Sequence, residues 1–377
     1  MFKKKIRILY LAAADYTGTM NMFVQEHRAR GHKADFVTLS KSAEGFDNGL
    51  CLDLRPNGKD KAIIALRNLI SENSTFNGER ELLPGTPPFS SPSKLRQLAN
   101  RFQDIYYGRH INNFIKKHNL LDYDIYHLEG GIDFFKDYRI LPKLKAAGKI
   151  LIANYHGNDF RNRGVHPVMH QLADANMTCE WDIHFRYPGS HYLFLPMKKI
   201  ESLNRQTNDG DTIVICHLVR NEQLFYYKGS KKIKEITERV IKGRNAEFRL
   251  LCGLKHEQAL LELSKAHILI DQIGGGKGGY GYGMSAVEAL SLGLNVCVEI
   301  QPEMKSALGS HPFVEVDEFS LEANLTALLD NPQERKVRSL QGPQWVKSTH
   351  SISSITDKLY QIYHDIMRSK AHFTDYI

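Results

Sequence analysis

Cysteine is scarce in this sequence, and no two cysteines are spaced as a metal-binding or redox pair. The five cysteines are Cys51, Cys179, Cys216, Cys252 and Cys297. Zinc-binding and thioredoxin-like sites rely on Cys-x-x-Cys spacing, which does not occur here. The odd number and the wide spacing favour buried free thiols in a reducing compartment.

Long apolar runs are also missing, because no stretch approaches the ~18 residues that a membrane-spanning helix needs. The beginning of the chain, MFKKKIRILYLAAADY, has the lysines, apolar residues and alanines of an export signal. However, Arg7 interrupts the apolar run and Asp15 ends it early. We therefore expect a first β-strand here rather than an export signal, and a cytoplasmic protein.

The bulk composition is that of an ordinary globular protein, with 42% hydrophobic and 24% charged residues. At ~100–200 residues per domain, a chain of 377 residues predicts two domains. The formal net charge of +8 indicates a surface that attracts anions. Charge alone does not distinguish nucleotides, nucleic acid and acidic lipid.

Short apolar runs alternate with helical patterns along most of the sequence. Residues 6–12 predict a buried strand, a helical pattern follows to Arg30, and 34–39 predicts the next strand. Further strands are expected at 123–128, 149–155, 212–217, 246–251, 268–271 and 294–298, and further helices at 94–117, 135–147, 230–242, 256–265, 284–292 and 332–367. Because parallel strands need such crossovers, each half predicts an α/β, doubly wound sheet with helices on both faces.

The polar, turn-rich stretch 188–211 separates two such series of elements. We therefore predict an N-terminal Rossmann-like domain over 1–195 and a second over 196–345. The helical residues 346–377 are expected to pack back on the N-terminal domain. Ligands in open α/β sheets bind at the carboxyl ends of the strands, so the chemistry is expected in a cleft that both sheets face.

Glycine is concentrated in one place, where seven of the ten residues from 274 to 283 are glycine. A helical pattern that contains Glu288 follows directly. The segment GYGMSA at 281–286 fits the dinucleotide fingerprint G-x-G-x-x-A. That fingerprint belongs in a tight turn after its strand, whereas ten residues separate Asp271 from Gly281. Dinucleotide binding is therefore one interpretation, and not the favoured one.

Three other interpretations of the glycines differ in what they require. A nucleoside-triphosphate loop needs Ser or Thr after its lysine, but Gly278 follows Lys277. The spacing Ser285-x-x-Glu288 is that of a capping box, in which case the glycines form a plain surface loop. Alternatively, the free N–H groups at the start of the helix bind a phosphate group, and the glycines let the backbone approach it.

The sequence around these glycines resembles a known signature. The run GYGMSAVEALSLGLNV at 281–296 resembles the GFGLPPLEAMACGxPV signature of glycosyltransferases with the GT-B fold, especially family 4. The segment YKGS at 227–230 resembles the family's KG segment, and YHGNDFR at 155–161 resembles its H-G-x-D segment. The first loop, with Gly18, and RGH at 30–32 resemble the family's N-terminal glycine loop and the GH after it. These segments follow the family's order and span nearly the whole chain.

The resemblance implies the GT-B architecture, in which two Rossmann-like domains face a cleft and C-terminal helices follow. It implies a glycosyltransferase that moves a hexose-type sugar from a UDP, GDP or ADP sugar to a hydroxyl group. The acceptor would be a glycan, a lipid-linked compound or another hydroxyl compound, as in polysaccharide biosynthesis. Retention at the anomeric carbon is implied, and the nucleotide sugar is a co-substrate, so no separate cofactor is expected.

The resemblance also assigns roles to individual residues. The expected catalytic residues are His156, which contacts the donor sugar, Lys228, which grips the diphosphate, and Glu288, which binds the ribose hydroxyls. The expected donor-binding residues are Gly18, Arg220, Lys228, Gly281, Tyr282, Gly283, Met284, Ser285 and Glu288. The expected acceptor-side residues are Glu129, Asp159 and Arg161.

Structural interpretations of the same residues stay open. Asp159 and Arg161 could simply pair with each other, Glu129 could be a loop carboxylate, and Lys228 could belong to a solvated basic patch. The sequence also departs from the family, because Tyr280 stands where many members carry the first glutamate of a pair. Two other function classes remain: an NAD(P)-dependent oxidoreductase, and a non-catalytic GT-B protein that binds nucleotides or glycans.

Metal and nucleic-acid binding are not expected. Asp122-Tyr-Asp124 and Asp209-Gly-Asp211 have the D-x-D spacing of metal-binding sugar transferases, but both precede strands, at the wrong end for a cleft. The basic stretches 94–117 and 228–244 are not accompanied by zinc ligands, RNP-type aromatics or a helix-turn-helix pattern. A solvated face or peripheral contact with the inner face of a membrane fits them better.

Overall fold

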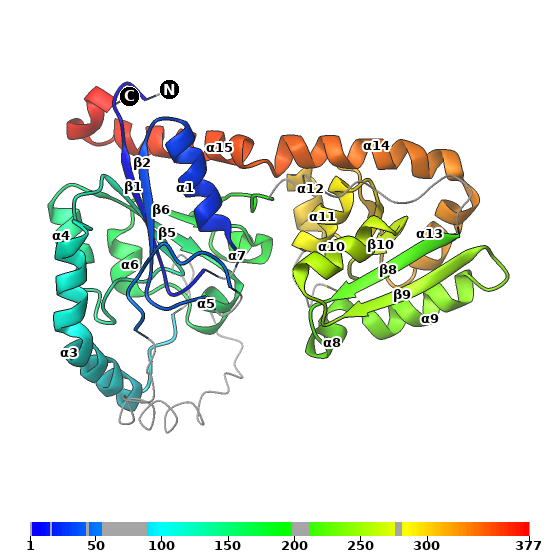
Figure 1. Cartoon of the computed structure of the whole chain (residues 1–377), viewed down its shortest axis with the longest axis horizontal. Helices are drawn as coiled ribbons and strands as arrows, with labels where there is room; N and C mark the ends of the chain where they lie inside the picture. Colours follow the sequence, from blue (N-terminus) through cyan, green and yellow to red (C-terminus); the bar gives the residue numbers. More distant parts are fainter. Residues whose placement is uncertain are drawn as a thin grey trace. The chain divides into compact units, whose positions relative to one another are not determined.

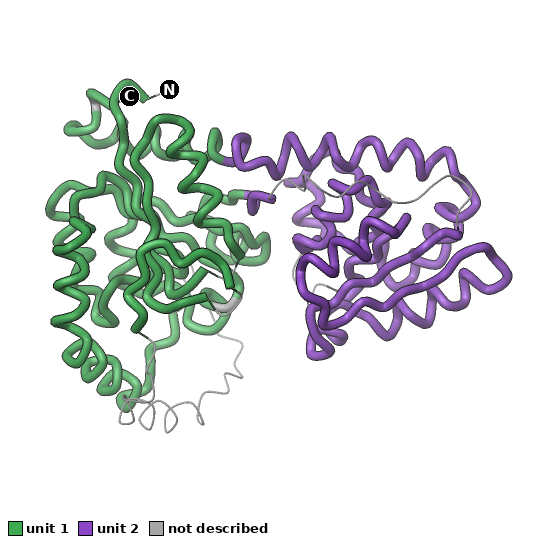
Figure 2. The backbone as a smooth tube through the Cα atoms, viewed as in Figure 1, with its two compact units in different colours: residues 1–193, 356–377 green, residues 194–355 purple. Residues whose placement is uncertain are grey.

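The computed structural model describes residues 2–15, 17–42, 45–54, 89–197, 212–275 and 281–376 of the chain. The chain forms two compact units, shown in Figure 2. Unit 1 comprises residues 1–193 and 356–377, and unit 2 comprises residues 194–355. Each unit has its own parallel sheet and its own hydrophobic core, and the two are described separately below.

Unit 1 contains a seven-stranded sheet in the order β3-β2-β1-β4-β5-β6-β7, and all of its strand pairs are parallel. Figure 1 shows β1, β2, β5 and β6 of this sheet. The strands are β1 (Arg7–Ala12), β2 (Lys33–Thr38), β3 (Leu50–Cys51), β4 (Ile125–Glu129), β5 (Ile150–Tyr155), β6 (Ala175–Thr178) and β7 (Ser190–Tyr192).

The central strands of unit 1 are apolar because helices cover both faces of a parallel sheet. Ile8, Leu9 and Leu11 of β1 are buried, as are Ile150 and Leu151 of β5. The chain leaves β1 toward β2 on one side, and β4 later pairs with the other side of β1. The carboxyl ends of β1 and β4 therefore flank the topological switch point of this sheet, where ligands of such folds bind.

Two helices of unit 1 lie where they were predicted, one prediction needs correction, and α5, α6 and α7 were not predicted. They are α1 (Thr19–Ala29), α3 (Lys94–Lys117), α4 (Leu141–Ala146), α5 (Gly157–Asn162), α6 (Pro167–Leu172) and α7 (Trp181–Arg186), with η2 (Ala371–Tyr376) near the end. The prediction of a helix over 135–147 is wrong in its first half. Tyr138 has a φ of +61°, which no helix continues through. The buried carboxylate of Asp133 also binds the amide N–H groups of Phe134 and Ile140 there.

Unit 2 contains a five-stranded parallel sheet in the order β12-β11-β10-β8-β9. The strands are β8 (Ile213–Val219), β9 (Ala246–Cys252), β10 (Ile268–Ile270), β11 (Asn295–Val298) and β12 (Val314–Glu315). The chain moves from β8 to β9 on one side and then to β10 on the other. The switch point of this sheet therefore lies between the carboxyl ends of β8 and β10. The predicted fold class, α/β with two doubly wound sheets, is confirmed.

The helices of unit 2 connect these strands and then continue to the end of the unit. They are η1 (Glu222–Leu224), α8 (Phe225–Lys228), α9 (Ser230–Val240), α10 (His256–Ser264), α11 (Met284–Ser291), α12 (Pro302–Leu308), α13 (Leu321–Asp330) and α14 (Pro332–Thr349). The predicted helix over 332–367 is two helices. The first, α14, ends at Thr349, and α15 (Ile352–Arg368) begins after His350 and Ser351. Among the described residues, no helix combines the length and the apolar character needed to cross a bilayer.

Within unit 1, the middle of α15 is attached by a buried network of histidine and tyrosine side chains. The His27 ring lies 2.9 Å from the hydroxyls of both Tyr10 and Tyr360. The His127 ring lies 2.5 Å from the hydroxyl of Tyr363 and stacks on Tyr10. Burial lowers the pKa of His27 and lowers the pKa of His127 to about 4, so both rings are neutral in the folded chain at pH 7.

We predict that this network makes unit 1 acid-sensitive. His127 takes up a proton in the unfolded chain near pH 6.5, but in the folded chain only near pH 4. The stability from its neutral ring is therefore present above pH 6.5 and is lost as pH falls below it, at up to about 1.4 kcal/mol per pH unit. Urea unfolding at pH 7 and pH 5 should show a smaller acid loss for His127→Gln than for the unaltered protein. Equal losses would show that His127 is not the group that titrates.

Candidate functional site

A buried carboxylate lies at the switch point of unit 2. Asp271 directly follows β10, and its side chain is fully buried. Its Oδ1 accepts hydrogen bonds from Lys228 Nζ at 2.6 Å and from Ser285 Oγ at 2.9 Å, and its Oδ2 accepts one from the Gly283 N–H at 2.8 Å. One acid therefore fixes both the KG segment and the beginning of α11.

The surroundings of Asp271 keep it ionised. Burial alone would raise the pKa of its carboxyl, but the charge of Lys228 and the three donors outweigh burial and lower that pKa. A buried carboxylate that is paired and fully hydrogen-bonded in this way is a rigid anchor. Its sequence position offered a signal, because a lone acid ends the apolar run 268–271 at the carboxyl end of a strand. The family resemblance does not include this residue.

Close packing against the KG segment and α12 explains some of the glycines. A side chain at Gly274 would overlap the backbone carbonyl of Tyr227, and one at Gly281 would overlap the Met304 sulfur. The Gly281 carbonyl also accepts a hydrogen bond from the Gln272 side chain. The glycines therefore allow the loop to pack closely. Residues 276–280, which include Lys277, Gly278 and Tyr280, lie outside the described part of the chain.

Glu288 lies on α11, and its Oε1 is 2.8 Å from Nε2 of His256 at the start of α10. The carboxylate is mostly buried, whereas the histidine is mostly exposed. The capping-box interpretation of Ser285 and Glu288 is wrong, because Gly283 is the residue that caps α11 and Ser285 binds Asp271 instead. The Glu288 side chain is thus held by His256 of α10, and not by the backbone at the start of α11.

The remaining predicted donor-binding residues of unit 2 have different surroundings. The Tyr282 ring packs against Phe313 and Trp345, and its hydroxyl lies 3.0 Å from His350 Nε2. Met284 packs against the same core. Arg220 is exposed and directly follows β8, at the switch point. The structure therefore brings Lys228, Gly283 and Ser285 together through Asp271, while the Tyr282 side chain faces the core.

A second polar cluster lies at the carboxyl ends of β4, β5 and β6 in unit 1. His156 Nε2 is 2.7 Å from Glu129 Oε2, which also accepts a hydrogen bond from Asn154. His156 Nδ1 is 3.7 Å from the sulfur of Cys179, which follows β6. Burial disfavours the charged ring, but the bonds to Cys179 and Glu129 outweigh it and raise the pKa of His156 well above its ordinary value.

The other acceptor-side residues have structural partners. The Asp159 carboxylate accepts a hydrogen bond from the His156 backbone N–H at 2.9 Å and thereby caps the start of α5. Arg161 forms two hydrogen bonds to Asp182, at 2.6 and 2.9 Å, and one to Glu180 at 3.0 Å. Arg161 therefore pairs with α7 and the residue before it, and not with Asp159 as one interpretation of the sequence had it.

The predicted glycine loop follows β1, on the other side of the unit 1 switch point. Gly18 has a φ of +73°, a conformation that favours glycine, and it begins α1. Its N–H and that of Thr17 donate to Oδ1 of Asp15, while Oδ2 of this buried carboxyl has no hydrogen-bond partner among the described residues. Burial raises the pKa of Asp15. The family resemblance does not include Asp15, although its position three residues after β1 was a signal.

The D-x-D pair that the structure describes is not part of either cluster. Asp122 and Asp124 both bind Arg7, at 2.6 and 2.9 Å, at the amino end of β4. Asp209 and Asp211 lie outside the described residues. Within the described ranges, no three His, Cys, Asp or Glu side chains are close enough to hold a metal ion. Metal independence stays a prediction.

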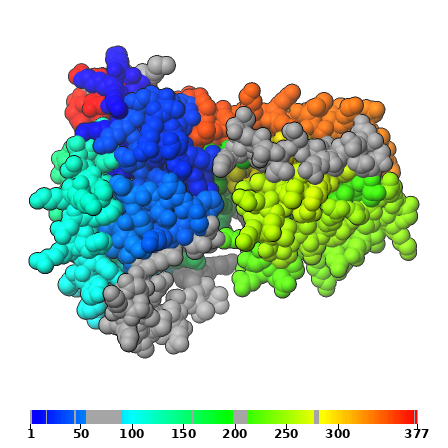
Figure 3. Space-filling view, viewed as in Figure 1, coloured from blue at the N-terminus to red at the C-terminus, as the bar shows by residue number. Residues whose placement is uncertain are grey.

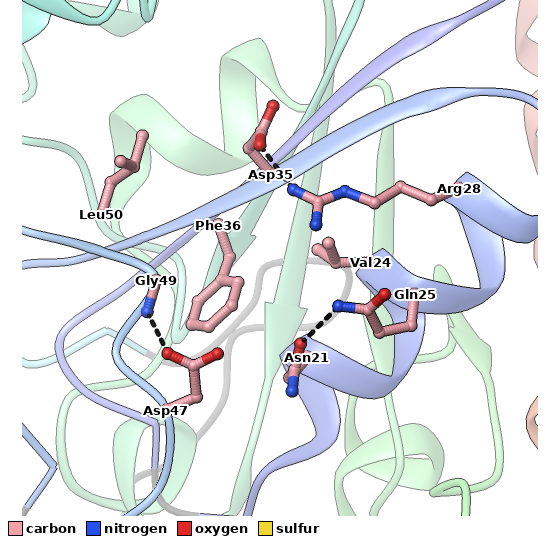
Figure 4. Close-up of a pocket in the computed structure, with 9 residues that line it drawn as sticks. All are labelled: Asn21, Val24, Gln25, Arg28, Asp35, Phe36, Asp47, Gly49 and Leu50. Carbon is pink, nitrogen blue, oxygen red and sulfur yellow. Dashed lines mark hydrogen bonds and ion pairs between the residues drawn. The ribbon is translucent and has the colours of Figure 1, made fainter.

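A small pocket of about 160 Å³ lies elsewhere in unit 1, between α1, β2 and the residues before β3. Figure 4 shows that Arg28 reaches Asp35 across it, while Asp47 binds the Gly49 N–H. The pocket is lined by Asn21, Val24, Gln25, Arg28, Asp35, Phe36, Asp47, Gly49 and Leu50. None of the predicted site residues lines it.

Comparisons with known proteins find similarity at the level of structure. No protein-family model matches the sequence, and no curated protein matches it. Sucrose-phosphate synthase from Thermosynechococcus elongatus matches with a TM-score of 0.52 and 12% identity, covering 96% of this chain and 100% of that chain. HepE from Anabaena, in complex with UDP, matches with a TM-score of 0.51 and 10% identity over the same shares of the two chains.

A third structure, TarM from S. aureus in a complex that contains UDP, matches with a TM-score of 0.52 and 10% identity. The match covers 95% of this chain and 100% of that chain. These matches extend over both units, and the proteins share the GT-B architecture. The chain therefore has the GT-B fold, as the sequence motifs predicted.

We predict that Asp271 is the main electrostatic anchor of unit 2. Asp271→Ala leaves the largely buried Lys228 cation without its partner, which should lower the free energy of unfolding by about 3–5 kcal/mol. Glu322→Ala is the matched control, because it breaks an exposed ion pair with Arg239 and should cost about 0–1 kcal/mol. Chemical denaturation measures both. Equal, small losses would show that Asp271 anchors nothing.

We also predict that Glu129 controls the protonation of His156. Replacing Glu129 by Gln removes a negative charge 2.7 Å from the ring and should lower the pKa of His156. NMR titration of the histidine ring protons measures this shift. Glu180→Gln is the control, because Glu180 binds Arg161 and should leave the His156 titration nearly unchanged. Superimposable titrations of the Glu129→Gln and unaltered proteins would contradict the assignment.

Proposed function

We propose that this chain is a glycosyltransferase that moves a sugar from a nucleoside-diphospho-sugar to an acceptor hydroxyl. The observation that carries the proposal is the joining of Lys228 and the start of α11 by Asp271 at the switch point of unit 2. An ammonium group and the free N–H groups of a helix start together suit a diphosphate. HepE and TarM, which have this fold, were solved with UDP, so a UDP sugar is the first donor to test.

In this proposal the positive groups stabilise the leaving diphosphate. An ammonium carries three donors, and one N–H of Lys228 is directed at Asp271, so the others remain for phosphate oxygens. Preorganised donors of this kind stabilise charge that develops in the transition state. Hydrogen-bond donors aimed at the phosphate oxygens would thus take the place that a metal ion has in other transferases, which is why we propose that no metal is required.

Glu288 binds the ribose in this proposal. A carboxylate accepts several hydrogen bonds, so the bond to His256 leaves capacity for the ribose hydroxyls. The charged ring of His156 would contact a donor-sugar hydroxyl, and Glu129 holds that ring in place. Retention would follow if the leaving phosphate assists the incoming hydroxyl on the same face of the sugar.

The acceptor that we propose is a glycan or a lipid-linked hydroxyl compound. The net charge of +8 supports attraction to an anionic surface. We therefore also propose that this protein is cytoplasmic and makes peripheral contact with the inner face of a membrane. Because Arg161 binds Asp182 and Asp159 binds the His156 N–H, Glu129 is the remaining one of the three expected residues that would face an acceptor.

We predict that the protein releases a nucleoside diphosphate from at least one of the UDP, GDP and ADP sugars. Lys228→Ala should lower kcat about 10²- to 10³-fold, because it removes a donor to the leaving group. Glu288→Gln should raise the KM for the donor about tenfold, because a hydrogen bond to a charged group is weakened. A coupled assay for the released nucleoside diphosphate measures both parameters.

The control for Lys228 is Lys231→Ala, because Lys231 is an exposed lysine on the next helix. It should leave kcat within about twofold of the unaltered value, as is usual for exposed surface substitutions. If Lys228→Ala and Glu288→Gln leave both turnover and donor binding intact, the proposed site is wrong. If no donor is turned over but one binds, the chain is a nucleotide-binding member of the fold.

A further inference from the structure

The edges of the two sheets differ in length. In the described part of the chain, three of the four sheet edges are formed by strands of two or three residues, namely β3, β7 and β12. Such short edges offer little backbone to another strand. The fourth edge strand, β9, has seven residues and pairs with β8 along its whole length. Figure 1 shows β9 at the edge of unit 2, and Figure 3 shows yellow-green side chains of this region on the surface. A further strand would therefore add at β9.

The outer side of β9 carries backbone groups that a further strand can bind. The Ile213 N–H of β8 donates to the carbonyl of Asn245, directly before β9, at 3.0 Å. The Gly253 N–H donates to the Val219 carbonyl of β8 at 3.3 Å. Backbone direction alternates along a strand, so the odd-numbered residues of β9 face β8 and the even-numbered residues face outward. The outward N–H and C=O groups, which have no partner within the described ranges, belong to Ala246, Phe248 and Leu250.

The side chains of β9 do not protect this edge from pairing. Long edges of soluble proteins are commonly protected by lysine, proline or a bulge, and β9 has none of these. Its two charged side chains, Glu247 and Arg249, are 44% and 35% exposed and form an ion pair with each other. Arg249 also lies 3.6 Å from Glu262 on α10. The edge therefore carries one charge of each sign on the same face, two residues apart.

This spacing makes the edge complementary to a second copy of itself in one antiparallel register. A two-fold axis at Phe248 places that residue opposite its own copy as a hydrogen-bonded pair, which agrees with its outward N–H and C=O groups. Glu247 then lies opposite the second copy's Arg249 on both sides of the axis, where opposing side chains are closest. Moving the axis by one residue in either direction would bring two Glu247 or two Arg249 side chains together.

Exposed apolar side chains lie beside the same edge. Leu250 is 38% exposed, Leu254 is 36% exposed and Leu261 of α10 is 41% exposed. The contact of Arg249 with Glu262 places α10 next to β9, so these side chains belong to one surface. A second copy would cover them and would add apolar area to a strand pairing that is small by itself. A strand of uniform charge would satisfy only one of the two charged groups.

We propose that two copies of this chain associate through β9, antiparallel about Phe248, so that the sheets of the two unit 2 copies form one continuous sheet. The contact uses the same surface on both copies, so it closes with two copies and produces a dimer. It involves none of the residues assigned to the nucleotide sugar. The dimer is therefore testable separately from the transferase activity.

The test is sedimentation velocity of the full chain over a range of concentrations, in which we expect a reversible dimer. Glu247→Arg alone and Arg249→Glu alone should each raise the dimer Kd at least about tenfold, because two opposite-charge pairs become like-charge pairs. The double variant with Glu247→Arg and Arg249→Glu should return the Kd to within about threefold of the unaltered value, because opposite charges face each other again. Loss of folding would not produce this restoration.

The matched control is Lys336→Glu, which changes the net charge by the same amount as Arg249→Glu. Lys336 is exposed on α14, which packs against α11 and β11. This variant should dimerise like the unaltered chain, and far-UV circular dichroism verifies that every variant is folded. A chain that stays monomeric up to about 0.1 mM would overturn the proposal and leave the edge to a strand of another protein. A dimer that the single variants do not weaken, or that the double variant does not restore, would overturn it too.

Discussion

Every strand pair of both sheets is parallel, and this constraint determines most of the rest of the structure. A parallel pair cannot be closed by a tight turn, so each strand is followed by a crossover, usually through a helix. The carboxyl ends of the strands therefore meet at one edge of each sheet. The polar groups that the apolar core excludes gather there: Asp15, Glu129 and His156 in unit 1, and Asp271 in unit 2.

Most of the longer elements were predictable from sequence because their signals are local, whereas short elements such as β3, β7 and α5 to α7 were not predicted. The apolar run of β1 and the whole of α3 lie where periodicity and chain punctuation placed them. The beginning of α4 was not predictable in this way. The chain before it is held by the Asp133 carboxylate and by the positive φ of Tyr138, and neither changes the pattern of apolar residues. The end of α14 before His350 was missed too, because the His350 ring is held by the Leu195 carbonyl and the Tyr282 hydroxyl, which are distant in sequence.

The candidate site was predictable only in part. Motifs identified Lys228 and Glu288, but the partners that hold them, Asp271 and His256, are 43 and 32 residues away in sequence. Spacing rules do not identify such pairs, because the pairing exists only once the sheet has formed. The glycine loop shows the same limit. Its glycines suggested a phosphate-binding loop, whereas Gly274 is also needed because the backbone of Tyr227 leaves no space for a side chain, and Gly281 packs closely against the Met304 side chain.

The pairing of Lys228 with Asp271 has a consequence for how an anion would be recognised in unit 2. The buried carboxylate already balances the ammonium charge, so the pair presents little net charge to a distant ligand. An incoming diphosphate would therefore be selected by the direction of hydrogen bonds over short distances, and ionic strength would affect its binding at this pair only weakly. Shape and donor geometry, and not a strong positive field, would distinguish a diphosphate from other anions at this pair.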